Sequence, residues 1–170
     1  PPRSTLFPYT TLFRSYFAIV SGSPQLDRDR IDEPIGYHPH EREKMAIRRG
    51  HPLSRSAETF YEVVERFEGF ASVRILPKTG RTHQIRVHLG HIGCPVLCDP
   101  HYGGRSRLTR GEIRRRPGDV TVLLERQALH ARRLKISHPS TGLPLEFEAP
   151  LPGDMQAVLD ELRQFRRRGG

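Results

Sequence analysis

The strongest pattern in the sequence is an alternation of polar and apolar residues over Thr59–Phe67, which resumes over Ala71–Leu76. Successive side chains of a strand point to opposite faces, so a period of two predicts strands with one buried face. Glu68 and Gly69 separate the two runs, and glycine suits the tight turn of a hairpin. Any fold of this chain therefore has to contain a sheet built around this hairpin.

The segment Thr79–Leu89 follows the hairpin directly. Gly80 permits a tight turn, and Thr82 is a good N-cap, so we expect a helix that begins just after Thr82. The helix has an apolar stripe with spacings of four and three, formed by Ile85, Leu89 and Ile92. Gly93 and the proline two residues later end the helix, and Pro95–Leu97 predicts a short buried strand.

A second face of this helix carries His83 and Arg86, one turn apart. The helix N-terminus has free N–H groups and a positive dipole end, and Arg81 next to it would favour a phosphate. Spacing alone is explained equally well by a surface helix whose histidine and arginine are merely solvated. The residues on either side decide between these readings.

The segment Thr79–His88 resembles the third motif of the RluA-type pseudouridine synthases, T-G-R-x-H-Q-[IL]-R-x-H. The continuation of that motif, H-P-[IV]-x-G-D-x-x-Y-G, matches Cys94–Gly103, with Cys94 in place of the histidine and Cys98 in place of the glycine. Tyr16–Gly22 is similar to the second motif, K-x-Y-x-A-x-V-x-G, and Arg14 stands where the lysine is expected. The resemblance covers about residues 16–165.

The resemblance implies an α+β fold with a mixed, largely antiparallel sheet and flanking helices. It implies isomerisation of uridine to pseudouridine in structured RNA, ribosomal or transfer RNA, with no metal and no cofactor. Tyr16 and Arg86 fall on catalytic positions, and Arg86 is the residue that pairs with the family's nucleophilic aspartate. Three residues at the helix start are expected to bind RNA or to shape the pocket: Arg81, His83 and Gln84.

The nucleophile motif of the family, H-R-L-D-x-x-T-S-G, has no counterpart in the sequence. Asp27 lies in a short Leu-Asp segment, but Gln25 stands where the motif has arginine, and no Thr-Ser-Gly follows. We interpret Asp27 and Asp29 as solvated loop carboxylates and Asp99 as a residue that holds a turn. The chain is then expected to be inactive alone, with Arg86 facing solvent and the Tyr16 strand at an exposed sheet edge. The alternative is a non-catalytic RNA-binding module or pseudoenzyme.

Residues 1–15 differ from the rest of the chain. Thr5-Leu6-Phe7 recurs at Thr11-Leu12-Phe13, and the sequence does not begin with methionine. We interpret residues 1–15 as a non-native leader and residues 16–170 as part of a pseudouridine synthase catalytic domain.

The sequence beyond the helix predicts further strands over Val120–Leu124, Leu129–Ile136 and Leu143–Phe147. A helix capped by Asp154 should follow. Its inward-facing residues are Met155, Val158, Leu159 and Leu162.

The charge balance favours a nucleic-acid partner. The chain has 28 lysines and arginines against 19 acidic residues, a net charge of +9, and only three of the basic residues are lysines. Arginine's planar fork suits phosphates, although a GC-rich genome would also enrich arginine. Residues 105–118 read as a flexible basic loop. It either contacts RNA backbone through Arg105, Arg107, Arg114, Arg115 and Arg116 or is only a solvated insertion.

The cysteine content and the hydropathy bear on the cellular compartment, on metal binding and on membrane insertion. Two cysteines give no disulfide framework, which indicates a reducing cytoplasm. Cys94 and Cys98 lack a second ligand pair, so a zinc site and a metal-dependent hydrolase have little support. No apolar run approaches membrane-spanning length. The oligomeric state does not follow from the sequence.

Overall fold

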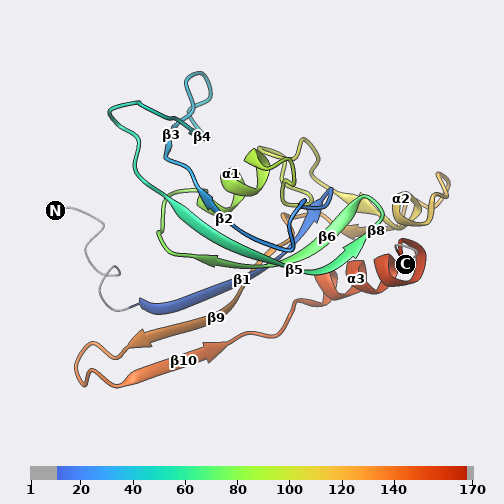
Figure 1. Ribbon diagram of the computed structural model, residues 1–170. Coiled ribbons are helices and arrows are strands. Elements are labelled where there is room, and N and C mark those ends of the chain that lie inside the picture. The colour runs from blue at the N-terminus through green and yellow to red at the C-terminus, as the bar shows by residue number, and fades with distance from the viewer. Residues whose placement is uncertain (1–10, 168–170) are drawn as a thin grey trace.

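The computed structural model describes residues 11–167 (Figure 1). One six-stranded sheet has the strand order β10-β9-β1-β6-β5-β2, and every pairing in it is antiparallel. Its strands are β1 (Thr11–Ser21), β2 (Arg28–Asp32), β5 (Glu58–Phe67), β6 (Phe70–Pro77), β9 (Leu129–Ser137) and β10 (Pro144–Glu148). The α+β fold predicted from the sequence is confirmed, and among the described strands the sheet is antiparallel throughout rather than mixed.

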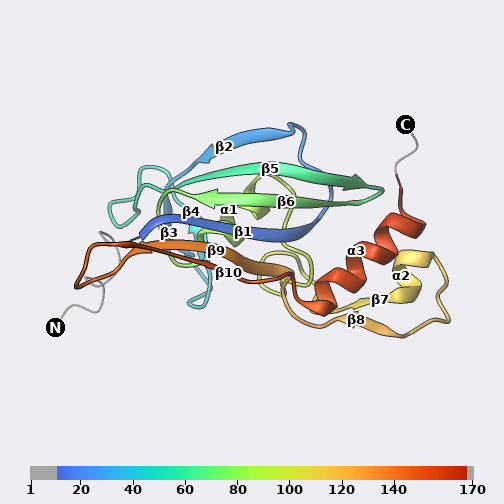
Figure 2. The same ribbon diagram turned by 90° about the horizontal axis from the view of Figure 1, so that it is seen from below.

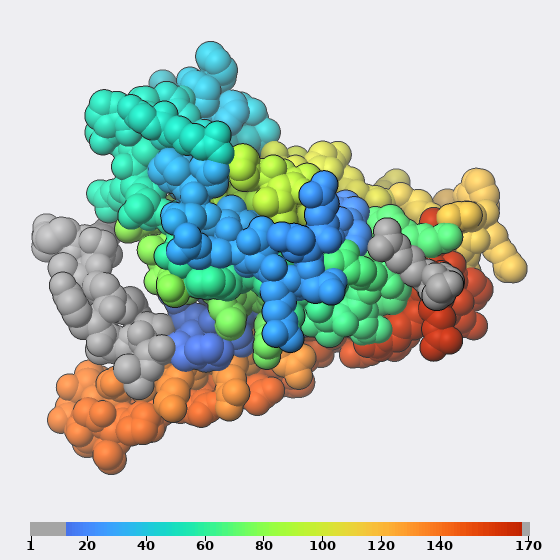
Figure 3. Space-filling model, viewed as in Figure 1, coloured from blue at the N-terminus to red at the C-terminus, as the bar shows by residue number. Residues whose placement is uncertain are grey.

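Two smaller sheets and three helices complete the fold of the described residues. The two-stranded sheets pair β3 (Ile35–Tyr37) with β4 (Met45–Ile47) and β7 (Leu108–Thr109) with β8 (Val122–Leu124). The helices are α1 (Gln84–His91), α2 (Arg110–Arg114) and α3 (Gly153–Phe165). Helix α1 lies over the sheet, whereas α2, α3 and the β7–β8 pair gather at one end of it (Figures 1 and 2). The space-filling view shows the β3–β4 lobe, residues 35–56, standing out from the body at the upper left (Figure 3).

The predicted hairpin is confirmed as β5 and β6. The strands pair from Thr59 with Pro77 to Phe67 with Phe70. Gly69, in the turn, has φ 77°, a conformation that glycine adopts without strain. The register shifts between Val63 and Glu65, so the alternation of buried and exposed residues is interrupted there.

Strand β1 is central, which corrects the expectation that the Tyr16 strand lies at a sheet edge. It pairs with β6 on one side and β9 on the other, and the edges of the sheet are β10 and β2. β1 begins at Thr11, so the proposed boundary between residues 15 and 16 falls inside a strand. The non-native origin of residues 1–15 stays a prediction, and the first ten of them lie outside the described residues.

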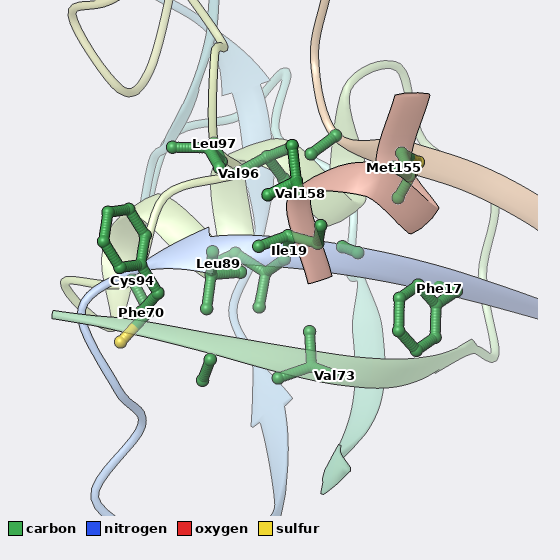
Figure 4. Packing of buried hydrophobic residues seen from close by; sticks show 14 of the residues in the cluster. Phe17, Ile19, Phe70, Val73, Leu89, Cys94, Val96, Leu97, Met155 and Val158 are labelled. Atoms are coloured by element: carbon green, nitrogen blue, oxygen red, sulfur yellow. The ribbon is translucent and has the colours of Figure 1, made fainter. Parts of the chain in front are cut away.

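The core forms where the sheet meets the helices and the segment after α1 (Figure 4). Ile19 and Val73 of the sheet, Leu89 of α1 and Met155 of α3 all belong to one buried apolar cluster. Burial of each such side chain contributes about 1.5–3 kcal/mol, which fixes α1 against the sheet. The inward face predicted for the last helix is confirmed, since its four predicted apolar residues are buried.

Two local predictions around the core are wrong. The N-cap of α3 is Pro152, and the carboxylate of Asp154 instead receives two hydrogen bonds from Arg126. Pro95–Leu97 is no strand, because only Val96 forms a bridge, to Val20.

The predicted flexible basic loop is also wrong, because residues 105–118 contain β7 and α2. Thr109 caps α2 by accepting a hydrogen bond from the Glu112 N–H, and the Glu112 carboxylate accepts one from the Thr109 N–H. This reciprocal pair is a capping box, whose Thr-x-x-Glu signature was present in the sequence.

Candidate active site

A pocket of about 150 Å³ opens where β1, the end of β6 and the start of α1 meet. Both predicted catalytic residues, Tyr16 and Arg86, belong to its wall. The complete lining is Arg14, Tyr16, Pro77, Thr79, Gly80, Arg81, His83, Gln84, Ile85, Arg86 and Leu129. The three residues predicted at the helix start therefore lie in the same wall, and the five arginines predicted to contact RNA between residues 105 and 116 do not.

The loop before α1 is held by Gln84. Its side-chain oxygen accepts hydrogen bonds from the Arg81 N–H (3.0 Å) and the Thr79 hydroxyl (2.8 Å). Its amide nitrogen donates to Glu58 O (3.0 Å) and Thr59 Oγ1 (2.9 Å). Both amide protons are used inside the protein, so this side chain shapes the pocket and has no donor left for RNA.

The helix begins one residue later than predicted. Its N-cap is His83, which has the left-handed backbone conformation φ 54°, and no side chain caps the helix. Thr82 is therefore not the cap. The contact from Gln84 to the Arg81 N–H organises this end of the helix instead.

Arg86 forms a buried ion pair with Asp99, which corrects the expectation that it faces solvent. Its Nε lies 2.6 Å from Asp99 Oδ2 and its Nη2 2.8 Å from Oδ1. The Arg86 side chain is 12% exposed and that of Asp99 0%. Asp99 Oδ1 also accepts the backbone N–H groups of His101 and Tyr102, so it ties down the turn as predicted.

The pKa values follow from these contacts. Burial opposes ionisation of Asp99, but the hydrogen bonds and charge of Arg86 outweigh it and hold the pKa of the carboxyl below its usual range. The same hydrogen bonds raise the pKa of Arg86. Among the described residues Arg86 Nη1 has no hydrogen-bond partner, and the ring of Tyr102 lies 4.9 Å from the guanidinium carbon. Nη1 is thus the position at which Arg86 can meet a second anion.

Arg14 is a pocket residue that the sequence reasoning assigned to the leader. Its Nη2 donates to Thr79 O (3.1 Å), and its Nη1 would lie 3.0 Å from a Cβ placed on Gly80. A glycine there leaves room for the guanidinium. The signal that identifies Arg14 was its match to the lysine of the second motif. Within residues 11–167 neither Arg14 nor Arg81 has a carboxylate at ion-pair distance.

No carboxylate lines the described pocket, because Asp99 lies behind Arg86. Asp27 belongs to a wider, open hollow of about 450 Å³ beside β5, whose lining contains neither catalytic position. As predicted, the Asp27 side chain is solvated, 84% exposed, and it pairs with Arg66. Asp29 is exposed too, although it lies in β2 rather than in a loop.

The arginines around α2 are mostly engaged by carboxylates. Arg105 pairs with Glu112, Arg114 with Glu161 (2.7 Å) and Arg115 with Glu68 (2.7 Å). In the described part of the chain, the two without such a partner are Arg107 and Arg116. The predicted RNA contacts of all five stay a prediction.

The cysteines are buried free thiols. Burial raises the pKa of Cys94, and it raises the pKa of Cys98 to about 11, so both are protonated near neutral pH. Between residues 11 and 167 no group of three or more histidine, cysteine and acidic side chains could hold a metal ion. None of the helices in that range is long and apolar enough to cross a membrane.

The antiparallel sheet and the pocket lined by Tyr16 and Arg86 are the features expected of a pseudouridine synthase. Comparison with known proteins gives the same class. Residues 4–91, just over half of the chain, match the RNA pseudouridylate synthase family. The chain belongs to that family.

Two curated relatives share the name ribosomal large subunit pseudouridine synthase D. The protein from Escherichia coli strain K12 is 41% identical over 152 residues, which are 88% of this chain and 44% of the relative. The protein from Pseudomonas aeruginosa is 44% identical over 155 residues, 90% and 46% of the two chains. The chain thus spans less than half the length of these relatives.

Two solved structures are similar to the fold. Human RNA pseudouridylate synthase domain containing 1 is 26% identical with a TM-score of 0.61, covering 89% of this chain and 65% of that one. Human RNA pseudouridylate synthase domain containing 4 is 25% identical with a TM-score of 0.65, covering 93% and 64%.

Proposed function

We propose that the chain carries the nucleotide pocket of an RNA pseudouridine synthase that isomerises uridine in ribosomal RNA. The observation that carries the proposal is the meeting of Tyr16 and Arg86 in one pocket wall. The names of the curated relatives support ribosomal RNA over transfer RNA as the substrate. An RNA substrate and two protonated free thiols favour a cytoplasmic location.

The reaction breaks the N1–C1′ bond of uridine, turns the uracil and joins its C5 to C1′. C5 then loses its proton and N1 gains one, so product and substrate are isomers. The target base first has to leave its stack, at a cost of about a few kcal/mol. Tyr16, half-buried in the wall, offers an aromatic face to the extruded base. Arg86, held from behind by Asp99, presents Nη1 to a nucleophilic carboxylate and keeps that carboxylate ionised in a secluded site.

The nucleophile itself is not in the described pocket, since no carboxylate lines it. We propose that a segment outside this chain supplies the aspartate, and that the chain alone binds RNA without turning it over. The same observation favours a second candidate, a non-catalytic RNA-binding module. The two candidates differ in whether an added aspartate segment restores chemistry.

The test compares the chain alone with the chain fused, before Thr11 so that β1 and Arg14 are kept, to a family segment that carries H-R-L-D. We expect no pseudouridine and no covalent adduct with 5-fluorouridine RNA from the chain alone, and both products from the fusion. Arg86→Ala in the fusion should abolish them, and Asp27→Ala should leave them unchanged. A folded fusion that binds RNA and stays inactive would favour the binding module. Turnover by the unfused chain that Asp27→Ala removes would overturn the proposed source of the nucleophile.

A further inference from the structure

Helix α1 carries a histidine whose hydrogen bonds are complete. His88 is fully buried, with Nδ1 2.9 Å from Thr59 Oγ1 and Nε2 3.0 Å from Glu33 O. A carbonyl oxygen can only accept, so Nε2 carries the proton. Thr59 Oγ1 already accepts the Gln84 amide, so its own proton goes to His88 Nδ1. His88 is a neutral imidazole with both nitrogens satisfied.

His83, at the start of the helix, has a hydrogen-bond partner at Nδ1 but none at Nε2 among the described residues. His83 Nδ1 lies 2.9 Å from the hydroxyl of Tyr102. That hydroxyl accepts the Met45 N–H at 2.9 Å, and its own proton can be donated to His83 Nδ1. With Nδ1 as the acceptor, the neutral ring carries its proton on Nε2. Burial, and then the charges of Arg86 and His101, lower the pKa of His83, which favours this neutral form.

The two rings differ in what their Nε2–H meets. At His88 it meets a backbone carbonyl, whereas at His83 it has no acceptor among residues 11–167, and the ring forms part of the pocket wall. His83 is half-buried, and its Nε2 is not among the buried side-chain atoms that lack a partner, so water reaches it when the pocket is empty. A ligand that enters the pocket can replace that water with an acceptor atom of its own.

We propose that His83 Nε2–H donates a hydrogen bond to a carbonyl oxygen of the uracil ring in the pocket, and that Tyr102 is the positioning residue that fixes the donor. The proposal rests on the proposed function and names a base-recognition contact for it. A neutral donor suits a neutral carbonyl, whereas phosphates are better met by the charged forks of Arg14 and Arg81 in the same wall. Tyr102 also joins this donor to the β3–β4 lobe through the Met45 N–H.

The test is nitrogen-detected NMR of the histidine rings in the whole chain, labelled with ¹⁵N, with uridine 5′-monophosphate as the probe. At pH 7 both His83 and His88 should be neutral with the proton on Nε2. Saturation with the nucleotide should shift His83 Nε2 and leave His88, the internal control, in place. Tyr102→Phe keeps the ring and removes the hydroxyl, so it should populate the other tautomer of His83 and leave that of His88 unchanged.

Affinity gives a second measurement that does not depend on the Tyr102 variant folding. His83→Phe should weaken binding of the nucleotide by up to about tenfold, the effect of one lost hydrogen bond. His91→Phe, at an exposed position on the same helix, is the matched control and should not weaken binding.

The outcomes separate this inference from the proposed function. If the Tyr16 ring signals respond to the nucleotide and those of His83 do not, the proposed contact between His83 and the base is wrong. The proposed nucleotide pocket is then still supported. If neither responds, the nucleotide pocket and the contact both fail. A His83 ring that is protonated at pH 7, or that carries its proton on Nδ1, would also overturn the inference.

Discussion

Two arginine-rich regions of the molecule differ in what their charges meet. Arg14 and Arg81 line the pocket and, in the part of the chain described, have no carboxylate at ion-pair distance. In the segment around α2, three arginines each pair with a glutamate: Arg105, Arg114 and Arg115. The number of arginines in a segment therefore does not locate an anion site. What matters is whether a carboxylate lies within ion-pair distance, because a guanidinium without one is available to bind a phosphate.

The ion pairs themselves also differ between the two regions. Arg86 and Asp99 form a buried pair with two short contacts, whereas the side chains of Arg115 and Glu68 are 68% and 51% exposed. Breaking a buried pair leaves a charge without water, but an exposed charge regains its hydration. The first pair should matter for stability and the second should not.

The largest expected effect is on stability at the pocket. Arg86→Ala leaves the buried carboxylate of Asp99 unpaired and should lower the free energy of unfolding by about 3–5 kcal/mol. Arg115→Ala is the matched control and should be indistinguishable from the wild type. Urea denaturation of the three proteins checks this. Equal losses in both variants would remove the distinction between the two regions.

Two glycines provide the next comparison. A Cβ on Gly111 of α2 would lie 2.3 Å from the backbone oxygens of Arg116 and Asp119, whereas on Gly80 it would meet only the end of the Arg14 side chain. Gly111→Ala should therefore cost about 1–3 kcal/mol or more, because backbone has to move. Gly80→Ala should displace the Arg14 guanidinium at little cost in stability. Thermal unfolding of both variants is the measurement, and a larger loss at Gly80 would contradict this account of the pocket wall.

The pH dependence of stability isolates Asp99. Its folded pKa is depressed, so its contribution is complete above the ordinary carboxyl pKa of about 4 and is lost as pH falls through the folded value. The difference in unfolding free energy between the wild type and Asp99→Asn should thus be greatest near neutral pH and should shrink in acid. Denaturation series at several pH values measure it. A difference that does not change down to the lowest pH would mean that Asp99 is not ionised in the fold.

The smallest effect is expected at α2. Arg114→Ala, Arg115→Ala and Arg116→Ala combined should weaken binding to all RNAs alike, but only slightly, because two of the three guanidinium groups already face glutamates. Filter binding to a structured RNA checks this. A loss of RNA affinity as large as that caused by replacing the pocket arginines would show that residues 105–118 are a main RNA contact.

The sequence predicted the features that depend on local patterns. The alternation in Thr59–Phe67 gave the hairpin, and the apolar spacing after Asp154 gave the buried face of α3. The motif match placed Tyr16 and Arg86, which the fold brings into one wall across two strands and a helix. Each of these signals lies within a short stretch of chain.

The features that the sequence missed depend on contacts between distant segments. The partner of Arg86 is Asp99, 13 residues away, and nothing in the local pattern shows that the turn after α1 folds back onto the helix. Arg14 reaches Thr79 across 65 residues. Pairing of the arginines around α2 with Glu68 and Glu161 likewise required the tertiary structure.

RNA affinity as a function of salt tests the central comparison most directly. Arg14→Gln with Arg81→Gln should reduce the slope of log affinity against log salt by about 1.5, the release expected from two phosphate contacts. Arg105→Gln with Arg115→Gln changes the net charge equally and should leave the slope near that of the wild type. The account predicts this difference between the two double variants. Equal slopes, or a larger loss in the α2 variant, would contradict it.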